Sequence, residues 1–183
     1  GASAPSTPYT TDREGRGPAW ANSLFEDNAE YGLGMAVANR QIRDKIAVLA
    51  NQLVRMQIPN ELKVALKVWL AVKDEGDGSV EPSRKLAKIL EDYPIADAEA
   101  RKIAAEIIKR KDFLVKKSVW ILGGDGWAYD IGYGGVDHIL ASGENVNLLV
   151  FDTEVYSNTG GQASKATPTA AIAKFAASGK RIK

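Results

Sequence analysis

The stretch ILGGDGWAYDIGYGG, residues 121–135, decides the fold that the sequence predicts. It leads out of a short apolar, β-rich run, residues 118–124, into a segment of residues 128–143 that can wind as a helix. A second apolar run, VNLLVFD, follows at residues 146–152. A strand, a glycine turn, a helix and a strand within about 35 residues predict a βαβ unit, which requires a parallel sheet with a right-handed crossover.

The residues before this unit predict a helical subdomain. Apolar side chains recur at steps of four and three from Ile42 to Met56, which places them on one face of a helix, and Pro59 ends that helix. A loop is expected over residues 74–83. Three further helices are expected: one reaching about Lys73, one ending near Tyr93, and one that starts from an N-cap at Asp97.

The composition changes twice along the chain and predicts three parts. Residues 1–27, rich in Pro, Gly, Ser and Thr, are expected to form an extended arm, residues 28–117 the helical subdomain, and residues 118–183 the βαβ core. The predicted fold class is therefore α/β, a parallel sheet with a largely helical insertion. Residues 167–183 look like a helix that has only begun, and the chain starts without methionine. Both ends are therefore expected to be cuts through a longer polypeptide.

Charge and residue types exclude several classes of function. A net charge of +1 points to neither nucleic acid nor an anionic membrane, and no apolar run approaches the roughly 20 residues that span a bilayer. Because the chain has no cysteine, it cannot supply disulfides, zinc–thiolate sites or iron–sulfur ligands. The single histidine, His138, is expected to be packed or capped rather than catalytic. A basic run is interpreted as a solvated face: Lys109, Arg110, Lys111, Lys116 and Lys117.

The glycines around Asp125 predict a ligand site. Ligands of a parallel sheet bind beyond the carboxyl ends of its strands, where Gly124 and Gly126 would allow a close approach. The following helix would offer free N–H groups to phosphate, but the carboxylate of Asp125 would repel a phosphate bound directly. A magnesium ion resolves this conflict, because it commonly joins a carboxylate to diphosphate oxygens.

A second loop, TEVYSNTGGQ at residues 153–162, follows the second predicted strand and should lie at the same edge of the sheet. Thr153 offers a hydroxyl, Val155 a carbonyl and Asn158 an amide, and two further glycines permit close approach. This layout is the one used for thiamine diphosphate. An earlier Gly-Asp-Gly at residues 76–78 follows a helix instead of a strand, so we interpret it as a surface turn.

Two blocks of sequence carry a resemblance to a known family. The block GGDGWAYDIGYGGVDHILASGENVNLLVFDTEVYSNTGGQASKATPTAAIAKFAASGK closely resembles the thiamine-diphosphate domain of pyruvate:ferredoxin (flavodoxin) oxidoreductases. The block GASAPSTPYTTDREGRGPAWANSLFEDNAEYGLGM resembles an earlier part of the same domain. The helices between them match more loosely but in order and length, so the resemblance covers essentially the whole chain.

The resemblance implies roles for matching positions. Asp125 and Thr153 would bind magnesium through their side chains and Val155 through its carbonyl, and Asn158 would reach the reacting centre as the catalytic residue. Other thiamine enzymes more usually have an asparagine where Thr153 stands. The residues implied to line thiamine diphosphate are Gly124, Asp125, Gly126, Trp127, Thr153, Glu154, Val155, Tyr156, Ser157 and Asn158.

The family implies a reaction that this chain can perform only in part. Such enzymes decarboxylate pyruvate oxidatively to acetyl-CoA and pass electrons through [4Fe-4S] clusters to ferredoxin or flavodoxin. The cluster cysteines, the glutamate that activates the cofactor and most pyruvate contacts are expected in the remainder of the polypeptide, so the isolated chain is predicted to be inert. The resemblance also implies a homodimer, cytoplasmic in a bacterium and otherwise in an anaerobic organelle or the cytosol. Two alternatives are a stand-alone module that binds a diphosphate cofactor and a non-catalytic structural remnant.

Overall fold

The computed structural model describes residues 11, 15, 17 and 27–181. The chain divides into two compact units, one of Gly1–Gly34 with Val119–Lys183 and the other of Met35–Ser118. The division falls within the first helix, α1 (Asn28–Val54). Almost all of the expected arm, residues 1–27, lies outside the described residues.

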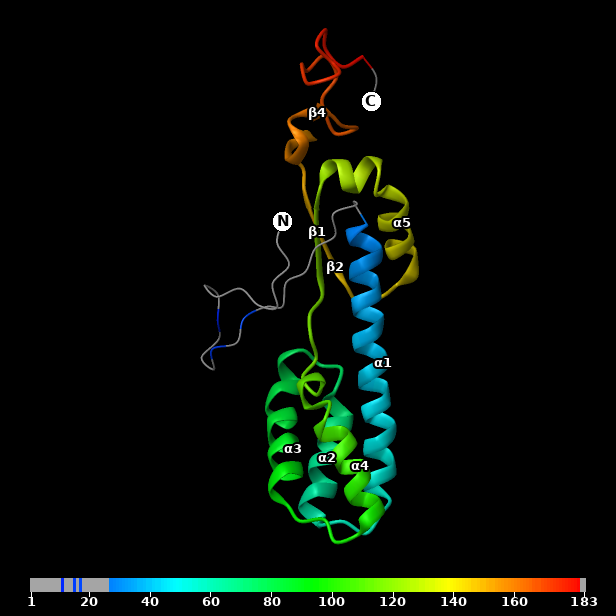
Figure 1. Ribbon diagram of the computed structural model, residues 1–183, viewed down its shortest axis with the longest axis vertical. Coiled ribbons are helices and arrows are strands. Elements are labelled where there is room, and N and C mark those ends of the chain that lie inside the picture. Colours follow the sequence, from blue (N-terminus) through cyan, green and yellow to red (C-terminus); the bar gives the residue numbers. More distant parts are fainter. Residues whose placement is uncertain (1–10, 12–14, 16, 18–26, 182–183) are drawn as a thin grey trace. The chain divides into compact units, whose positions relative to one another are not determined.

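The first unit contains the predicted parallel sheet. Strands β1 (Trp120–Gly124) and β2 (Asn147–Phe151) pair in parallel, with Trp120 opposite Asn147 and Gly124 opposite Phe151. Helix α5 (Tyr133–Ser142) lies in the connection between them (Figure 1). The α/β class and the βαβ unit are therefore confirmed.

Apolar side chains from the strands, the connection and the start of α1 form the core of this unit. Leu148 and Val150 of β2 are partly buried and pack against it, whereas Trp120, Leu149 and Phe151 are exposed. The buried members of the core are Ala29, Ile121, Trp127, Ala128, Val136 and Ile139. His138 is exposed on α5, so of the two expected alternatives, packed or capped, the packed one is wrong.

The predicted helix over residues 128–143 is divided in two. A single π-helical stretch, η3 (Gly126–Asp130), follows β1 directly, with the Ile131 N–H donating to the Gly126 carbonyl at 3.1 Å. Helix α5 begins only at Tyr133 and ends before Gly143, whose φ of 68° is the left-handed conformation that glycine adopts without cost. This π-helical stretch, which we call the wide turn, keeps the chain close to the end of β1 and thereby positions Asp125.

The expected helix over residues 167–183 does not form in its described part. Residues 168–181 contain turns and isolated bridges, and the side chains of Ile172 and Phe175 are exposed. A short helix in water depends on burying an amphipathic face. Since these two apolar side chains are largely exposed, the alanine-rich sequence alone is not sufficient.

The second unit is a helical bundle. Helices α2 (Asn60–Val72), α3 (Val80–Asp92) and α4 (Ala98–Ile108) pack with the later part of α1 around one core, and η1 (Asp77–Ser79) and η2 (Lys111–Phe113) are short 3₁₀ turns (Figure 1). The largest fully buried core side chains are Ile46, Leu53, Leu62, Leu66, Trp69, Leu86, Ile107 and Leu114.

Most sequence signals of this unit are confirmed. The Asp97 carboxylate accepts the Ala100 N–H at 2.7 Å as the N-cap of α4. The Gly-Asp-Gly at residues 76–78 is exposed and forms the turn that the sequence predicted, with Asp77 and Gly78 as the first two residues of η1. The expected loop over residues 74–83 is wrong in its second half, because α3 begins at Val80 and Pro82 lies in its first turn. Proline is tolerated there since the first N–H groups of a helix have no intrahelical partner.

Arg43 crosses the core of the bundle and joins its parts. The guanidinium is 6% exposed and donates to the carbonyls of Phe113 at 2.6 Å, Leu114 at 2.7 Å and Lys73. Burial lowers the pKa of Arg43 from its ordinary value. The indole N–H of Trp69 donates to the same Leu114 carbonyl at 3.0 Å, so the residues after α4 are held by two buried donors.

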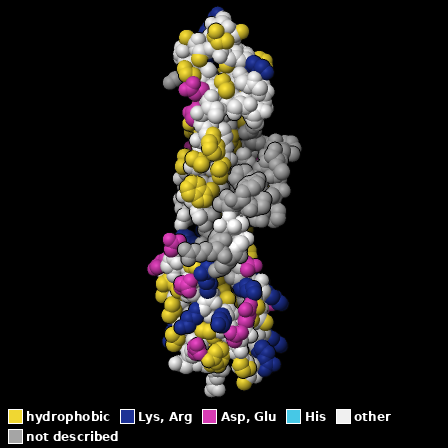
Figure 2. Space-filling view, turned by 90° about the vertical axis from the view of Figure 1, so that its left-hand side faces the viewer, with side chains coloured by type: hydrophobic (Ala, Val, Ile, Leu, Met, Phe, Trp, Pro, Cys, Tyr) yellow, Lys and Arg dark blue, Asp and Glu magenta, His cyan; other side chains and the backbone are white. Residues whose placement is uncertain are grey.

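The first three residues of the basic run pair with acidic side chains, whereas Lys116 donates to the Asp74 carbonyl and Lys117 lies over the Phe113 ring. Lys109 and Arg110 both contact Glu106, at 2.6 and 2.8 Å, and Lys111 contacts Glu91 at 2.7 Å. Figure 2 shows side chains of both signs mixed over this unit. In the part of the chain that the structure describes, no helix is both long and apolar enough to cross a bilayer.

Candidate metal and cofactor site

Asp125 is the buried charge at the end of the sheet. It follows β1 directly, starts the wide turn with helical backbone angles, and is 1% exposed. Its hydrogen bonds come from two hydroxyl groups, Thr153 Oγ1 to Oδ1 at 3.1 Å and Ser164 Oγ to Oδ2. Among the described residues no basic side chain pairs with it. A buried carboxylate without a positive partner is costly, so the site favours a cation.

Three oxygens from the two predicted loops form a cluster. Thr153 Oγ1 lies 3.1 Å from Asp125 Oδ1 and 3.0 Å from the carbonyl oxygen of Val155. We call Asp125 Oδ1, Thr153 Oγ1 and Val155 O the oxygen cluster. A hydroxyl carries one hydrogen, and the other two oxygens are acceptors, so only one of the two contacts is a hydrogen bond at any moment.

The oxygen cluster fits a small hard cation. Neighbouring ligands of an octahedral magnesium ion, each about 2.1 Å from the metal, are about 3.0 Å apart, which matches both contacts. The described residues contain no group of three or more Asp, Glu, His or Cys side chains that could hold a metal ion together. The site would therefore bind a cation through one carboxylate, one hydroxyl and one carbonyl, and its remaining positions would be open to diphosphate or water.

The loop after β2 is bent sharply to bring Thr153 and Val155 together. Glu154, between them, has a φ of 62°, a left-handed conformation that is uncommon for a side-chain-bearing residue. Strand β3 (Val155–Tyr156) then pairs antiparallel with β4 (Gln162–Ala163) around the 3₁₀ turn η4 (Ser157–Thr159). This small hairpin, which the sequence did not signal, fixes the direction of the Val155 carbonyl.

The glycines of the motif have different neighbours. A Cβ at Gly126 would lie 2.2 Å from the ring of Tyr156, so this glycine makes room for an aromatic side chain of the second loop. A Cβ at Gly123 would likewise meet the ring of Trp127 at 2.2 Å. The nearest atom to a Cβ at Gly124 is the Phe151 carbonyl oxygen at 3.9 Å. Gly124 therefore has the open surroundings expected for ligand approach, whereas Gly126 is filled from within the chain.

The other predicted site residues are distributed around the cluster. Ser157 Oγ lies 3.3 Å from Thr153 Oγ1. Trp127 is buried and its indole N–H has no hydrogen-bond partner in the described chain. Glu154 and Asn158 are exposed, and no hydrogen bond joins the Asn158 amide to the oxygen cluster in the described part. The structure thus brings together the three residues expected to bind the metal but leaves Asn158 on the outer turn.

Sequence reasoning missed four residues around the site. Ser164 and Thr167 are buried beside it, and Lys180 holds the segment that carries them. Tyr129 donates to Asp152 Oδ2 at 3.3 Å, and burial first, then the negative charges of Asp152 and Asp125, raises the pKa of Tyr129. Hydroxyl spacing in an irregular segment has no periodic pattern, so the sequence offered no signal for these contacts.

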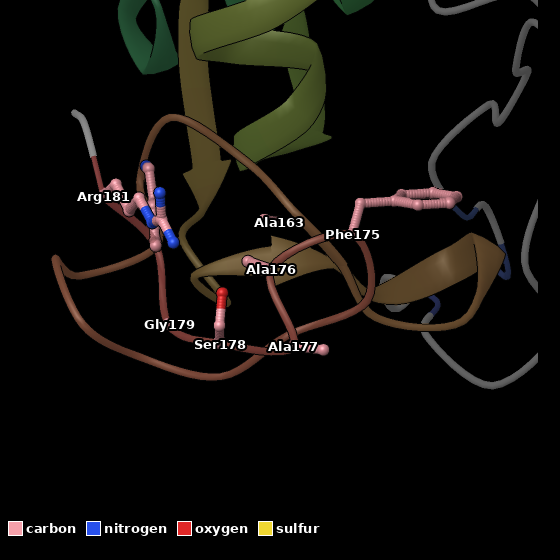
Figure 3. Close-up of a pocket in the computed structure, with 8 residues that line it drawn as sticks. Ala163, Phe175, Ala176, Ala177, Ser178, Gly179 and Arg181 are labelled. Atoms are coloured by element: carbon pink, nitrogen blue, oxygen red, sulfur yellow. The ribbon is translucent and has the colours of Figure 1, made fainter.

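A surface pocket lies in the same unit but away from the oxygen cluster. It is lined by Ala163 and by residues 175–181, with Phe175 at one end and Arg181 at the other (Figure 3). None of the three cluster residues lines it. The pocket is therefore not the metal site.

Comparison with known proteins gives relatives along the whole chain. The chain is 56% identical over 183 residues to pyruvate-flavodoxin oxidoreductase of Klebsiella pneumoniae, covering 100% of this chain and 15% of the relative. It is 54% identical over 184 residues to pyruvate:ferredoxin oxidoreductase of Moorella thermoacetica, and the alignment covers 100% of this chain and 16% of the relative. A pyruvate-flavodoxin oxidoreductase of Enterobacter agglomerans is 52% identical over 188 residues, and the alignment covers 100% of this chain and 16% of the relative. No family model matches the chain.

These similarities agree with the resemblance that the two sequence blocks carry. The identity extends over the helical unit as well as the α/β unit, because the alignments cover the chain from end to end. The chain spans about 15% of the length of the relatives it matches. Over its whole length, the chain is therefore similar to one section of these pyruvate-flavodoxin and pyruvate:ferredoxin oxidoreductases.

Proposed function

We propose that this chain is the magnesium- and thiamine-diphosphate-binding part of an oxidoreductase that converts pyruvate to acetyl-CoA. The observation that carries the proposal is the oxygen cluster, in which a buried carboxylate, a hydroxyl and a carbonyl meet at the edge of a parallel sheet. The position at the carboxyl ends of two parallel strands is where such folds bind ligands. The names of the relatives support pyruvate as the substrate.

Each group of the site has a distinct task in this proposal. Asp125 Oδ1, Thr153 Oγ1 and Val155 O hold the cation, which neutralises the diphosphate. Gly124 leaves open backbone beside it. Thiamine diphosphate, when bound, supplies the electron sink that the decarboxylation of a 2-oxo acid requires. Residues 124–127 and 153–158 line the cofactor and keep water from it, and Asn158 provides a polar group toward the substrate side.

The remaining chemistry requires other parts of the protein. The chain has no cysteine, so the iron–sulfur clusters that pass electrons to ferredoxin or flavodoxin are bound by the remainder of the polypeptide. The same holds for coenzyme A and for most contacts to pyruvate. We further propose that the complete enzyme is a cytoplasmic homodimer in a bacterial host.

Replacing Asp125 with alanine in the full-length protein tests this function. The measurement is the binding of thiamine diphosphate at increasing magnesium concentrations, followed by calorimetry. We expect Asp125→Ala to remove the magnesium-dependent part of the affinity, because the only carboxylate of the cluster is lost. The matched control is Asp137→Ala, at an exposed position on α5, which should bind as the unmodified protein does. Unchanged magnesium-dependent affinity in Asp125→Ala would contradict the proposed site.

A further inference from the structure

Three residues beyond the second loop form a second layer behind the oxygen cluster. Ser164 and Thr167 are 4% and 2% exposed, and Lys180 lies next to them. We call Ser164, Thr167 and Lys180 the clamp. None of these residues belongs to the cluster itself, yet each is joined to it directly or through another member.

Ser164 determines which oxygen of Asp125 faces the cluster. Its hydroxyl donates to Asp125 Oδ2, while Oδ1 lies 3.1 Å from Thr153 Oγ1. The carboxylate is thereby held at both oxygens, with Oδ2 directed to the Ser164 hydroxyl and Oδ1 directed to the cluster, where a cation would bind. Binding through a single oxygen suits the tight octahedron of magnesium, whereas calcium readily takes both oxygens of a carboxylate.

Thr167 holds the other side of the cluster. Its hydroxyl donates to the carbonyl of Glu154 and accepts the N–H of Ser164 at 2.9 Å. Glu154 is the residue in left-handed conformation between the two other cluster residues. Ser164 and Thr167, which are joined by a hydrogen bond, therefore connect the Asp125 carboxylate to the bend at Glu154 that orients the Val155 carbonyl.

Lys180 fixes this pair from behind. Its ammonium group donates to the carbonyls of Ser164 at 2.6 Å, Lys165 at 2.8 Å and Thr167 at 2.9 Å. An ammonium group has three hydrogens, so all its donors are used on one turn of backbone. The irregular C-terminal segment is thus anchored at the residues that contact the cluster.

We propose that Ser164 is a positioning residue that makes the site selective for magnesium over calcium, and that Thr167 and Lys180 hold it in place. This inference rests on the proposed magnesium site. Hydrogen bonds that orient a metal ligand commonly change metal affinity by roughly 10–100-fold. Losing the Ser164 hydroxyl frees Oδ2, so the carboxylate can rotate or bind through both oxygens. Magnesium affinity should then fall by that factor, and calcium affinity should fall much less.

The test measures cation binding rather than turnover. The full-length protein is loaded with thiamine diphosphate and Mn²⁺, free Mn²⁺ is followed by electron paramagnetic resonance, and Mg²⁺ or Ca²⁺ is titrated as competitor. Ser164→Ala should lower the ratio of magnesium to calcium affinity by roughly tenfold or more, and Ser164→Thr, which retains a hydroxyl, should restore it. Ser178→Ala, an exposed serine of the same segment, is the matched control and should change neither affinity.

Two parallel variants make the outcome decisive. Lys180→Met leaves the Ser164 hydroxyl in place and should lower the ratio of magnesium to calcium affinity by a smaller factor. If Ser164→Ala does not fold, Lys180→Met alone tests the inference. An unchanged ratio in Ser164→Ala and Lys180→Met, while Asp125→Ala abolishes binding, overturns the inference and leaves the metal site standing. A loss of stability without a change in the ratio also overturns it. Normal cation binding in Asp125→Ala overturns the metal site itself.

Discussion

The contact between Gly126 and Tyr156 joins the two loops of the site and yields a sharp prediction for Gly126→Ala. A Cβ at this position would lie 2.2 Å from Cε1 and 2.5 Å from Cδ1 of the Tyr156 ring, both well inside the ordinary contact distance of 3.4 Å. The backbone of Gly126 does not require glycine, since its φ is not in the left-handed range. The effect of alanine should therefore come from the ring alone.

The magnitude follows from two opposing contributions. Forcing an extra methyl group into a packed region costs about 1–3 kcal/mol. Replacing glycine with alanine restricts the unfolded chain and returns about 0.4–1 kcal/mol. The net loss is about 1–2 kcal/mol, which corresponds to a change in the opening equilibrium by a factor of roughly 5–30.

Hydrogen exchange read by mass spectrometry in the cofactor-free, full-length protein measures this effect locally. Amides of residues 126–130 should exchange roughly 5–30 times faster in Gly126→Ala. Gly124→Ala is the matched control in the same motif, because its Cβ meets nothing closer than 3.9 Å, and its exchange should be unchanged or slower. Adding Tyr156→Ala to Gly126→Ala removes the clash, so the double variant should exchange no faster than Tyr156→Ala alone.

Two results would refute this reasoning. Equal exchange in Gly126→Ala and Gly124→Ala would mean that the Tyr156 ring does not pack against Gly126. A double variant that exchanges faster than either single variant would mean that the glycine is needed for its backbone rather than for the space it leaves.

Two further predictions concern the helical unit of the full-length protein. Arg43→Met should leave the carbonyls of Phe113 and Lys73 without the guanidinium donor, whereas the Leu114 carbonyl keeps the Trp69 indole. The region after α4 should be destabilised by about 3 kcal/mol, seen as faster exchange over residues 110–118, and no change there would contradict the role of the guanidinium. Hydrogen bonds from Lys109 and Arg110 lower the pKa of Glu106 from 4.5 to about 2. Since the pKa of Glu106 is lower in the folded state, this carboxylate stabilises α4 above pH 4.5 and loses that effect as the pH falls toward 2. Glu106→Gln should therefore flatten the pH dependence of α4 opening between these two pH values, measured by hydrogen exchange after correction for intrinsic exchange. An unaltered pH dependence would count against the pairing of Glu106 with Lys109 and Arg110.

The elements with regular periodicity could be predicted from the sequence. Apolar runs separated by a glycine turn led to β1, β2 and their parallel pairing, and the spacing of Ile42 to Met56 led to α1. The meeting of Asp125 with the second loop also followed, because the carboxyl ends of neighbouring parallel strands share one edge of a sheet. These predictions rest on local patterns and on one rule of topology.

Contacts that depend on irregular backbone could not be predicted. Ser164 reaches Asp125 across 39 residues of turns and short strands, and no residue pattern marks that path. Gly126 was expected to admit a ligand, but the space beside it is occupied by Tyr156. The predicted C-terminal helix failed for a related reason: helix-forming residues need a partner surface, and Ile172 and Phe175 are exposed in the described chain.

The most direct test of the account is a crystal structure of the full-length protein with thiamine diphosphate and Mn²⁺, with an anomalous difference map recorded for the manganese. We expect one strong anomalous peak within about 2.5 Å of Asp125 Oδ1, Thr153 Oγ1 and Val155 O, with diphosphate or water oxygens in the remaining positions. A peak at other residues, or a bound cofactor whose diphosphate is far from these three oxygens, would contradict it.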